Sequence, residues 1–426
     1  MNGMSRAARR LRSLLARGDV ALQVCGPHAG YFYRPRELVC SLEDDDQLQP
    51  IFRRFGGDRR DRWVDTAKSW RGELRTVKQP VRRESVDLSK LGLARWFMPP
   101  DIAVPGLVAL IRQEISLRAP AALSPNFLMF GEQWWGGEPG DVPDPMSLEE
   151  ALSLELHGVQ EPSGCEHHSV TVVDTGIDRA ATDHHPPLAN LAFDDADVDV
   201  LNNDANDFLD EQAGHGTFIA GIIRRRAPGV GIESVRGLDT NGVTDALTIS
   251  DLVTKIAEGG TSRVINLSLG GRAAGDVPGL DAALETCRRH DVVVVAAAGN
   301  AGRPDEFYPA AHKDVIGVGA VESDDPSQRA AFSNYGDWVT ACAVGTKVPG
   351  LHVVGQWDPE HTEPEGSSVV LDKFARWSGT SFATPVVAAA IVEHMAANPN
   401  LSARDAAADL LASSPAGPPM LGKFIT

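Results

Sequence analysis

The sequence predicts an α/β protein with a mostly parallel central sheet, preceded by a small N-terminal α/β module. From residue 168 onward, short apolar runs alternate with stretches of helical apolar spacing, the pattern of repeated strand–helix units. Runs such as VVVVAAA, which ends at Ala298, are apolar at every position, as a parallel strand buried on both faces requires. A length of 426 residues favours two or three domains.

The N-terminal module spans residues 20–131. The segment GYFYRPRELVC has strand character, and SPNFLMFG at 124–131 predicts a short closing strand. Between them, DQLQPIFRRFGG and PGLVALIRQEISLR show the apolar spacing of helices. Residues 1–19 form a basic tail. Residues 132–165, which include a stretch rich in Gly, Pro and acidic side chains, are expected to be a linker.

The larger part is expected over residues 166–415, followed by a C-terminal tail over 416–426. Apolar runs predict its strands at 169–173, 264–269, 292–298, 315–320 and 338–343. Helical spacing predicts helices at 216–223, 245–258, 279–290 and 381–397. The excursion over 351–377 predicts a β-hairpin with a polar tip.

Three short segments place a carboxylate, an imidazole and a hydroxyl in glycine-containing turns: Asp174 in VTVVDTGID, His215 in GHGT and Ser381 in SGTSFATP. Asp174 falls at the carboxyl end of a predicted strand, where sites in open α/β sheets collect, and the other two each open a predicted helix. Nucleophilic acyl transfer requires this set of groups. His215 would take the proton of the Ser381 hydroxyl and return it to the leaving amine, while Asp174 would orient the imidazole.

A fourth segment, VVVVAAAGN, ends at Asn300. An amide at this point, together with the backbone N–H of Ser381, would form an oxyanion hole for the charge that develops during attack. The expected helix N-terminus at Ser381 adds partial positive charge. Each motif alone is common by chance, so their joint occurrence in one order carries the prediction.

With their connecting segments, these motifs resemble those of the subtilisin-like serine proteases, or subtilases. VINLSLGG, FYPAAHKDVIGVGAV and FSNYGDWV are similar to further segments of that family. The resemblance implies a subtilisin-like three-layer α/β fold and serine endopeptidase activity. It also implies substrate-binding residues, which are Ser268, Leu269, Gly270, Ala297, Ala298 and Gly299. One position departs from the family, which usually has a second histidine where this chain has Phe218.

The resemblance leaves two alternatives open. Phe307 corresponds roughly to the floor of the pocket for the residue before the scissile bond. An inward ring would favour small side chains there, whereas an outward ring would let Asp305 and Glu306 favour basic ones. The module resembles a subtilase pro-domain, which assists folding and occupies the active site with its C-terminal end. The rival interpretation is an unrelated regulatory or substrate-recognition domain.

The net charge of −18 is unevenly distributed. Residues 1–130 hold 22 Lys and Arg against 14 Asp and Glu, and the remainder holds 18 against 44. The two parts can therefore attract each other. The acidic larger part repels phosphate, which argues against nucleic-acid binding. No stretch of the sequence predicts a membrane span.

Cysteines and acidic side chains supply the remaining expectations. The odd cysteine count and an N-terminus without an apolar signal segment predict free thiols and a cytoplasmic protein. The acidic segment 193–212 offers oxygen ligands that calcium prefers, but it matches no EF-hand spacing. A calcium site and a solvated acidic loop remain alternatives. The pairs His167–His168 and His184–His185 lack the spacing of a zinc-binding helix, so structural roles are expected.

The sequence therefore predicts a serine endopeptidase that requires no cofactor. Control by the N-terminal module would keep it latent, and its substrate would be one particular protein or peptide precursor. A constitutively active enzyme would share the chemistry and differ only in control. The alternative from another class is a catalytically silent, subtilase-like binding protein, against which the intact set of Asp174, His215 and Ser381 argues.

Overall fold

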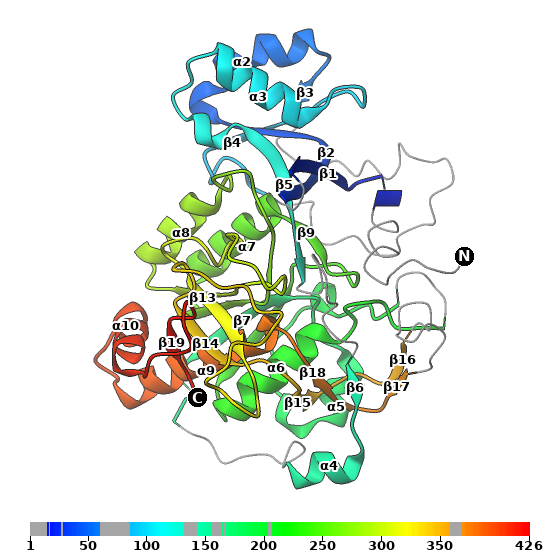
Figure 1. Ribbon diagram of the computed structural model, residues 1–426, viewed down its shortest axis with the longest axis vertical. Helices are drawn as coiled ribbons and strands as arrows, with labels where there is room; N and C mark the ends of the chain where they lie inside the picture. The colour runs from blue at the N-terminus through cyan, green and yellow to red at the C-terminus, as the bar shows by residue number, and fades with distance from the viewer. Residues whose placement is uncertain are drawn as a thin grey trace.

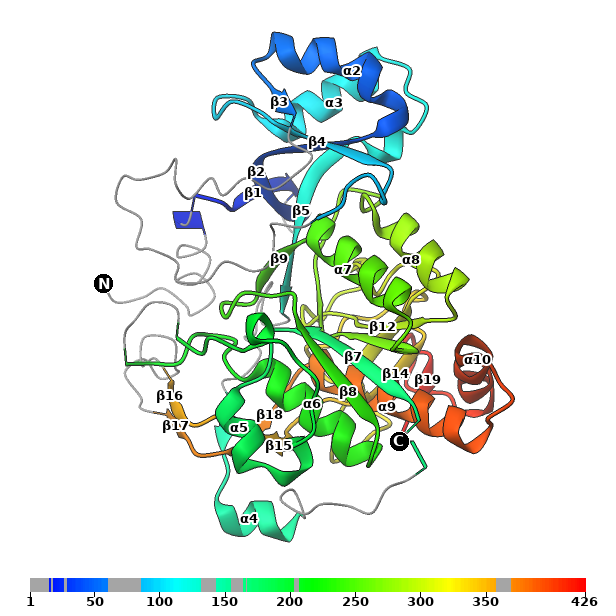
Figure 2. The same ribbon diagram turned by 180° about the vertical axis from the view of Figure 1, so that it is seen from behind.

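The computed structural model describes residues 15–16, 18–26, 29–59, 86–131, 143–154, 164–165, 167–202, 207–357 and 369–426. Most of the basic tail and, from the expected linker, residues 132–142 and 155–163 lie outside the described residues. Figure 1 shows the N-terminal module stacked on the larger α/β part. Figure 2 shows the same arrangement from behind.

A seven-stranded parallel sheet forms the centre of the larger part, in the order β19-β14-β13-β12-β10-β7-β8. Its strands are β7 (Ser169–Asp174), β8 (Gly231–Arg236), β10 (Val264–Leu267), β12 (Val293–Ala297), β13 (Ile316–Val321), β14 (Ala341–Val344) and β19 (Lys423–Phe424). Successive residues point to opposite faces, so Val172 enters one hydrophobic core and Val173 the other. The predicted parallel sheet is confirmed.

Helices cover both faces and complete three layers. On one face, the larger core contains α6 (His215–Arg226), α9 (Thr380–Ala397) and α10 (Ala403–Ser413). The opposite face is covered by α7 (Ala246–Gly259) and α8 (Leu280–Arg289). Within the described residues, α9 alone is long and apolar enough to cross a membrane, but 72% of that window is buried inside the protein. It is the central core helix of the larger part.

The N-terminal module is an antiparallel sheet with two helices on one face. Its sheet contains β1 (Ala21–Gly26), β2 (Ala29–Ser41), β3 (Asp58–Arg59), β4 (Leu93–Phe97) and β5 (Ser124–Gly131). The helices α2 (Leu42–Arg54) and α3 (Val104–Glu114) pack around Leu38 and Trp96. The opposite face packs against α7 and α8 through Val39 and Phe127. All four predicted elements of the module are present.

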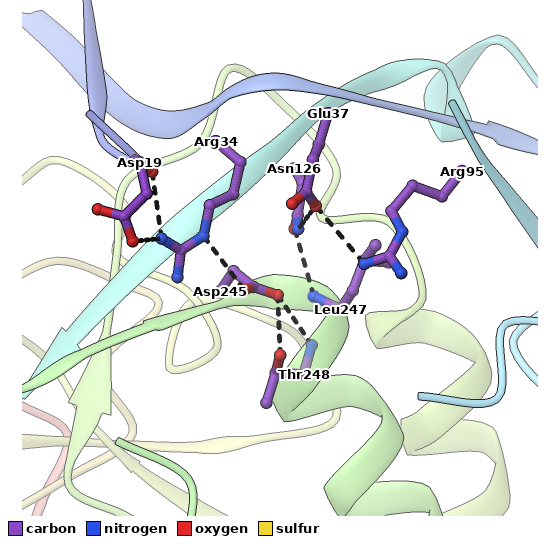
Figure 3. A network of polar contacts seen from close by, with 8 residues as sticks. All are labelled: Asp19, Arg34, Glu37, Arg95, Asn126, Asp245, Leu247 and Thr248. Atoms are coloured by element: carbon purple, nitrogen blue, oxygen red, sulfur yellow. Dashed lines mark hydrogen bonds and ion pairs between the residues drawn. The ribbon is translucent and has the colours of Figure 1, made fainter. Parts of the chain in front are cut away.

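A buried polar network joins the module to the N-terminus of α7 (Figure 3). Asp245 caps α7 and also accepts a hydrogen bond from Nε of Arg34 at 3.3 Å. Beside it, Asn126 donates to Glu37 at 2.8 Å and accepts from the backbone N–H of Leu247 at 3.5 Å. Burial raises the pKa of Glu37. The basic front and the acidic rear of the chain thus meet in specific contacts.

The described part of the expected linker is built into the larger part. β6 (Asp144–Pro145) pairs with β18 (Phe374–Trp377). The short helix α4 (Leu148–Ser153) follows and begins with a capping box at Ser147. Met146 and Ala151 are buried in the larger core. The structure therefore differs from a free linker over residues 143–154, because two apolar side chains anchor this stretch.

The expected hairpin before Ser381 is present. β16 (Gly355–Trp357) pairs with β17 (Val369–Leu371) in antiparallel register, and its tip, residues 358–368, lies outside the described residues. A second antiparallel pair, β15 (Val348–Leu351) with β18, brings Trp377 under the start of α9. The hairpin and this pair lie beside the larger sheet (Figure 1).

Candidate active site

Asp174 and His215 meet at the carboxyl edge of the parallel sheet. Asp174 ends β7 and is fully buried, and its Oδ1 accepts hydrogen bonds from Nδ1 of His215 at 2.7 Å and from the N–H of Thr175 at 2.8 Å. His215 begins α6 directly after Gly214, whose φ of 81° favours glycine. Because Nδ1 faces the carboxylate, Nε2 is the ring nitrogen left to take up a proton.

Ser381 lies in the first turn of α9, at the same edge of the sheet. Its Oγ donates to the carbonyl oxygen of Ser268 at 3.4 Å, and Oγ of Ser268 donates to the carbonyl of Ser381 at 2.9 Å. Asn266 donates to the same Ser268 hydroxyl at 3.0 Å. These bonds fix the start of α9 against the segment that follows β10.

Aromatic rings hold the imidazole next to the start of α9. The rings of Trp377 and Phe382, which flank Ser381 in the sequence, each lie 5.4 Å from the His215 ring, centroid to centroid. Phe218 packs edge-on against both, at 5.8 and 5.0 Å. Phe218 is buried in this cluster, so the departure from the family pattern changes local packing.

Asn300 lies beside the turn that precedes Ser381. Its Oδ1 accepts hydrogen bonds from the backbone N–H of Thr380 at 2.9 Å and from the Thr380 hydroxyl at 3.1 Å. Its amide nitrogen would lie 3.3 Å from a side-chain Cβ at Gly379. The carboxamide is therefore held by its oxygen, with its donor nitrogen beside the Gly379–Ser381 turn.

Comparison with known proteins decides the family. The model of the subtilase family (Peptidase S8) matches residues 166–422, which is more than half of the chain. The chain belongs to the subtilase family. Its larger part, with Asp174, His215, Ser381 and Asn300 at one edge of the sheet, is the subtilase domain.

Two characterised subtilases show the extent of the similarity. The thermophilic serine proteinase of Bacillus sp. (strain AK1) is 35% identical over 235 residues, which cover 53% of this chain and 51% of that protein. Thermitase of Thermoactinomyces vulgaris is 32% identical over 240 residues, which cover 54% of this chain and 74% of that protein. The chain thus spans about half the length of the Bacillus proteinase.

A solved subtilase structure shares the fold. The crystal structure of fervidolysin from Fervidobacterium pennivorans, a keratinolytic enzyme related to subtilisin, superposes with a TM-score of 0.59 at 16% sequence identity. The superposition covers 92% of this chain and 60% of fervidolysin. At this identity the likeness establishes the subtilisin-like three-layer fold and nothing further.

The module's last strand lies in the predicted substrate groove of the subtilase domain. The first half of β5 pairs with β2 of the module. Its second half pairs antiparallel with β9 (Val243–Asp245) on one side and with β11 (Leu269–Gly270) on the other. Gly131, at the end of β5, donates to the carbonyl of Gly242 at 2.8 Å. Leu269 and Gly270 therefore offer the strand edge that the sequence indicated, and Ser268 leads from it to Ser381.

The second group of predicted substrate-binding residues, Ala297, Ala298 and Gly299, is buried at the end of β12. Phe307 settles the orientation that the sequence left open. Phe307 is 8% exposed, and its ring packs between Gly270 and Gly299, so that a Cβ at Gly270 would clash with the ring and a Cβ at Gly299 would lie 3.1 Å from it. The ring therefore points inward and fills the space between the two predicted pocket walls. The inward orientation predicts a shallow pocket that favours small side chains at that point.

Sequence reasoning missed Asp199 and Gln212. Asp199 is fully buried and accepts hydrogen bonds from the Thr175 hydroxyl at 3.0 Å and from the backbone N–H of Gly214 at 2.8 Å. Gln212 is also fully buried and faces Gly131. Asp199 lies in a run of acidic residues, and nothing in the sequence distinguished it from the other carboxylates. Gln212 lies just before GHGT but belongs to no motif that would mark it as functional.

The described acidic side chains of segment 193–212 do not converge on a metal site. Asp197 accepts from the backbone N–H of Arg236, Asp199 faces the active site, and Asp195 pairs with Arg179 on the surface. No group of three His, Cys, Asp or Glu side chains within the described residues could hold a metal ion. Residues 203–206 lie outside them, so the calcium alternative stays a prediction.

Proposed function

We propose that this subtilase is a serine endopeptidase in which Ser381 is the nucleophile, His215 the general base and Asp174 its orienting carboxylate. The single observation that carries the proposal is the buried 2.7 Å bond from Nδ1 of His215 to Asp174 at the same sheet edge as the start of α9. The similarity to a serine proteinase and to thermitase supports the same activity.

The chemistry follows from this arrangement. Oγ of Ser381 attacks the substrate carbonyl carbon while Nε2 of His215 takes its proton. The carbonyl oxygen becomes an oxyanion, which the Asn300 amide and the N–H groups at the start of α9 stabilise. Collapse breaks the C–N bond, and the imidazolium gives its proton to the leaving amine. Water then hydrolyses the acyl-enzyme by the same steps, so the reaction needs no cofactor.

We further propose that the N-terminal module keeps the enzyme latent. The pairing of β5 with β9 and β11 is β-strand addition, the way in which extended peptides bind to sheet edges. While β5 remains there, a substrate strand cannot take the same edges. Substrates would be extended segments of a particular protein or peptide precursor, because a closed groove excludes general digestion.

Location is a separate proposal. Cys25 is an exposed free thiol, and Cys40, Cys287 and Cys342 are buried free thiols. Burial raises the pKa of Cys287 and Cys342 to about 12, which keeps them protonated and unreactive. Thiols that persist without pairing fit a reducing compartment such as the cytoplasm.

The deciding experiment follows the intact mass of the full-length wild type and of Ser381→Ala with time, and adds a fluorophosphonate probe that labels active serines. Self-processing would shorten the wild type between residues 131 and 143 and leave Ser381→Ala whole. If neither shortens but the probe labels the wild type, the module is a lock that awaits a trigger. If the probe labels neither the folded wild type nor a folded Arg34→Ala variant, whose module is loosened, the silent binding protein would be established instead.

A further inference from the structure

We infer that the groove selects glycine over larger residues at the second residue before the scissile bond, and that Gln212 sets this preference. The inference rests on the proposed protease function and names the class of peptide that the site would take. It starts from Gly131, the last described residue of β5. Gly131 pairs with Leu269 in the groove, next to Ser268.

The register of β5 defines which substrate residue Gly131 stands for. Phe130 pairs with Gly270 and Gly131 with Leu269, so the next residue of a bound strand faces Ser268. The carbonyl of Ser268 accepts the hydrogen bond from Oγ of Ser381. A substrate residue facing Ser268 therefore presents its carbonyl carbon to the nucleophile, and Gly131 marks the residue before it.

The backbone does not require glycine at position 131. Gly131 is not among the residues with positive φ, so an alanine could adopt its conformation. The side chains around Gly131, however, leave no space for a Cβ atom. A Cβ at this position would lie 2.5 Å from Oε1 of Gln212 and 3.2 Å from Cδ1 of Leu238. Selection would thus come from the walls of the groove.

The backbone and stem of Gln212 are held in place, so only its terminal amide can turn away from a Cβ. Its stem is in contact with Gly242, where an added Cβ would lie 2.6 Å from Cγ of Gln212. Its backbone N–H donates to the carbonyl of Thr240 at 3.0 Å, and its own carbonyl accepts from the N–H of His215 at 3.1 Å. The side chain is fully buried, with Gly131 on one side and Gly242 on the other.

The amide of Gln212 is itself an unusual feature of the groove. Neither its Oε1 nor its Nε2 has a hydrogen-bond partner within the described residues, although both are buried. An unpaired buried amide is costly, so its place needs a compensating role. Here the amide closes the groove against the Cα of Gly131. The opposite wall, Leu238, donates its N–H to the carbonyl of Asp174 at 3.0 Å, so each wall is attached to a proposed catalytic residue.

The first test uses the full chain and the rate at which a fluorophosphonate probe labels Ser381. Gly131→Ala should weaken the hold of β5 on the groove and speed labelling by about 10-fold or more, the range in which an added methylene is discriminated. Adding Gln212→Ala, or Gln212→Asn if that variant does not fold, should bring the rate back toward the wild type. Gly106→Ala is the control, because it changes an exposed module glycine with open surroundings.

The second test applies if the chain processes itself and is open to substrate. The processed enzyme is given a set of peptides Leu-Met-Phe-Gly-X-Gln, in which X is an equimolar mixture of amino acids. Two matched sets carry Ala or Ser in place of Gly. We expect the glycine set to be cut about 10- to 200-fold faster, and Gln212→Ala to narrow that ratio. The measured quantity is the ratio of cleavage rates for the Gly and Ala sets with the same enzyme. A general loss of activity lowers both rates equally and leaves this ratio unchanged.

The outcomes separate the two levels of the proposal. No labelling and no cleavage by any folded variant would overturn the protease function itself. Normal labelling or cleavage with equal rates for Gly and Ala would overturn the selection by Gln212 and leave the protease function standing. Faster cleavage of the Ser set would show that the Gln212 amide binds a polar side chain, which also overturns the inference.

Discussion

The carboxylate of Asp199 accepts a hydrogen bond from the backbone N–H of Gly214 at 2.8 Å, directly before His215. The same carboxylate oxygen accepts from the hydroxyl of Thr175, which follows Asp174. Thr175 in turn accepts from the N–H of Gly216 at 3.2 Å. One buried side chain therefore ties the end of β7 to the start of α6 and sets the distance between Asp174 and His215.

Asp199 should make the folded protein sensitive to pH. Burial raises its pKa to about 6 from an ordinary value of 3.8. An acid whose pKa is raised by folding stabilises the protein below its unfolded pKa and loses that contribution as pH rises through its folded pKa. The unfolding free energy should therefore fall between about pH 4 and pH 6, by at most about 3 kcal/mol from this group. Urea unfolding at several pH values measures it.

Asp199→Asn is the matched variant for that titration. The amide has the same shape and no charge in this range, so the difference in unfolding free energy between variant and wild type should grow with pH over the same window. Parallel curves for the two proteins would show that Asp199 is not the group responsible.

Substitutions at the proposed catalytic residues should separate chemistry from binding. Ser381→Ala and His215→Ala should lower kcat by about 10⁴- to 10⁶-fold. Asn300→Ala should cost about 100- to 1000-fold, the range measured for a member of this family, because only one oxyanion donor is lost. Peptide hydrolysis with active-site titration measures both. An Asn300→Ala enzyme with unchanged kcat would place the oxyanion donors elsewhere.

Phe307 should limit the size of the residue before the scissile bond. Phe307→Ala removes the ring that fills the space between Gly270 and Gly299, and substrate side chains can then occupy it. The preference for Leu over Ala at that substrate position should rise by roughly 10-fold, the discrimination expected from one or two methylenes in an apolar pocket. The ratio of kcat/KM for paired peptides measures it, and an unchanged ratio would mean that the substrate side chain does not enter this space.

Arg34→Ala should loosen the module. The guanidinium is buried against Asp245, and its loss removes the ion pair that this carboxylate makes with the module at the cap of α7. Truncating one member of a buried pair typically costs about 2–5 kcal/mol, so the probe should label Ser381 markedly faster. Arg36→Ala is the control, because its Nε donates to the Met98 carbonyl within the module. Equal labelling of the two variants would contradict a role for the network in docking.

The sequence predicted the elements that position Asp174, His215 and Ser381 to within a few residues, since buried parallel strands are apolar at every position and the helices begin at glycines. It did not predict β8 and α10. The run GIESVR in β8 alternates buried and half-buried residues, which weakens the apolar signal at a sheet edge. In α10 the buried residues are all alanines, Ala403, Ala406 and Ala407, which give little contrast with the alanines on its exposed face.

Side-chain contacts between distant segments were the second limit. The inward ring of Phe307 depends on the absence of side chains at Gly270, in β11, and at Gly299, in the turn after β12. Likewise, Gln212 is noticeable only because two glycines, one from the module, meet its side chain. The motifs identified the chemistry, whereas the shape of the groove depends on contacts that no local pattern encodes.

The strand β5 belongs to the module at one end and to the groove at the other. A cut one residue beyond Gly131 would therefore not free the groove by itself, since the end of β5 would remain paired as part of a bound product. What the cut changes is the effective concentration of that strand, because an attached segment becomes a separate molecule that dilution can remove. The cleaved enzyme should then be inhibited at high concentration and active at low concentration. The local concentration of the enzyme would therefore decide when proteolysis starts.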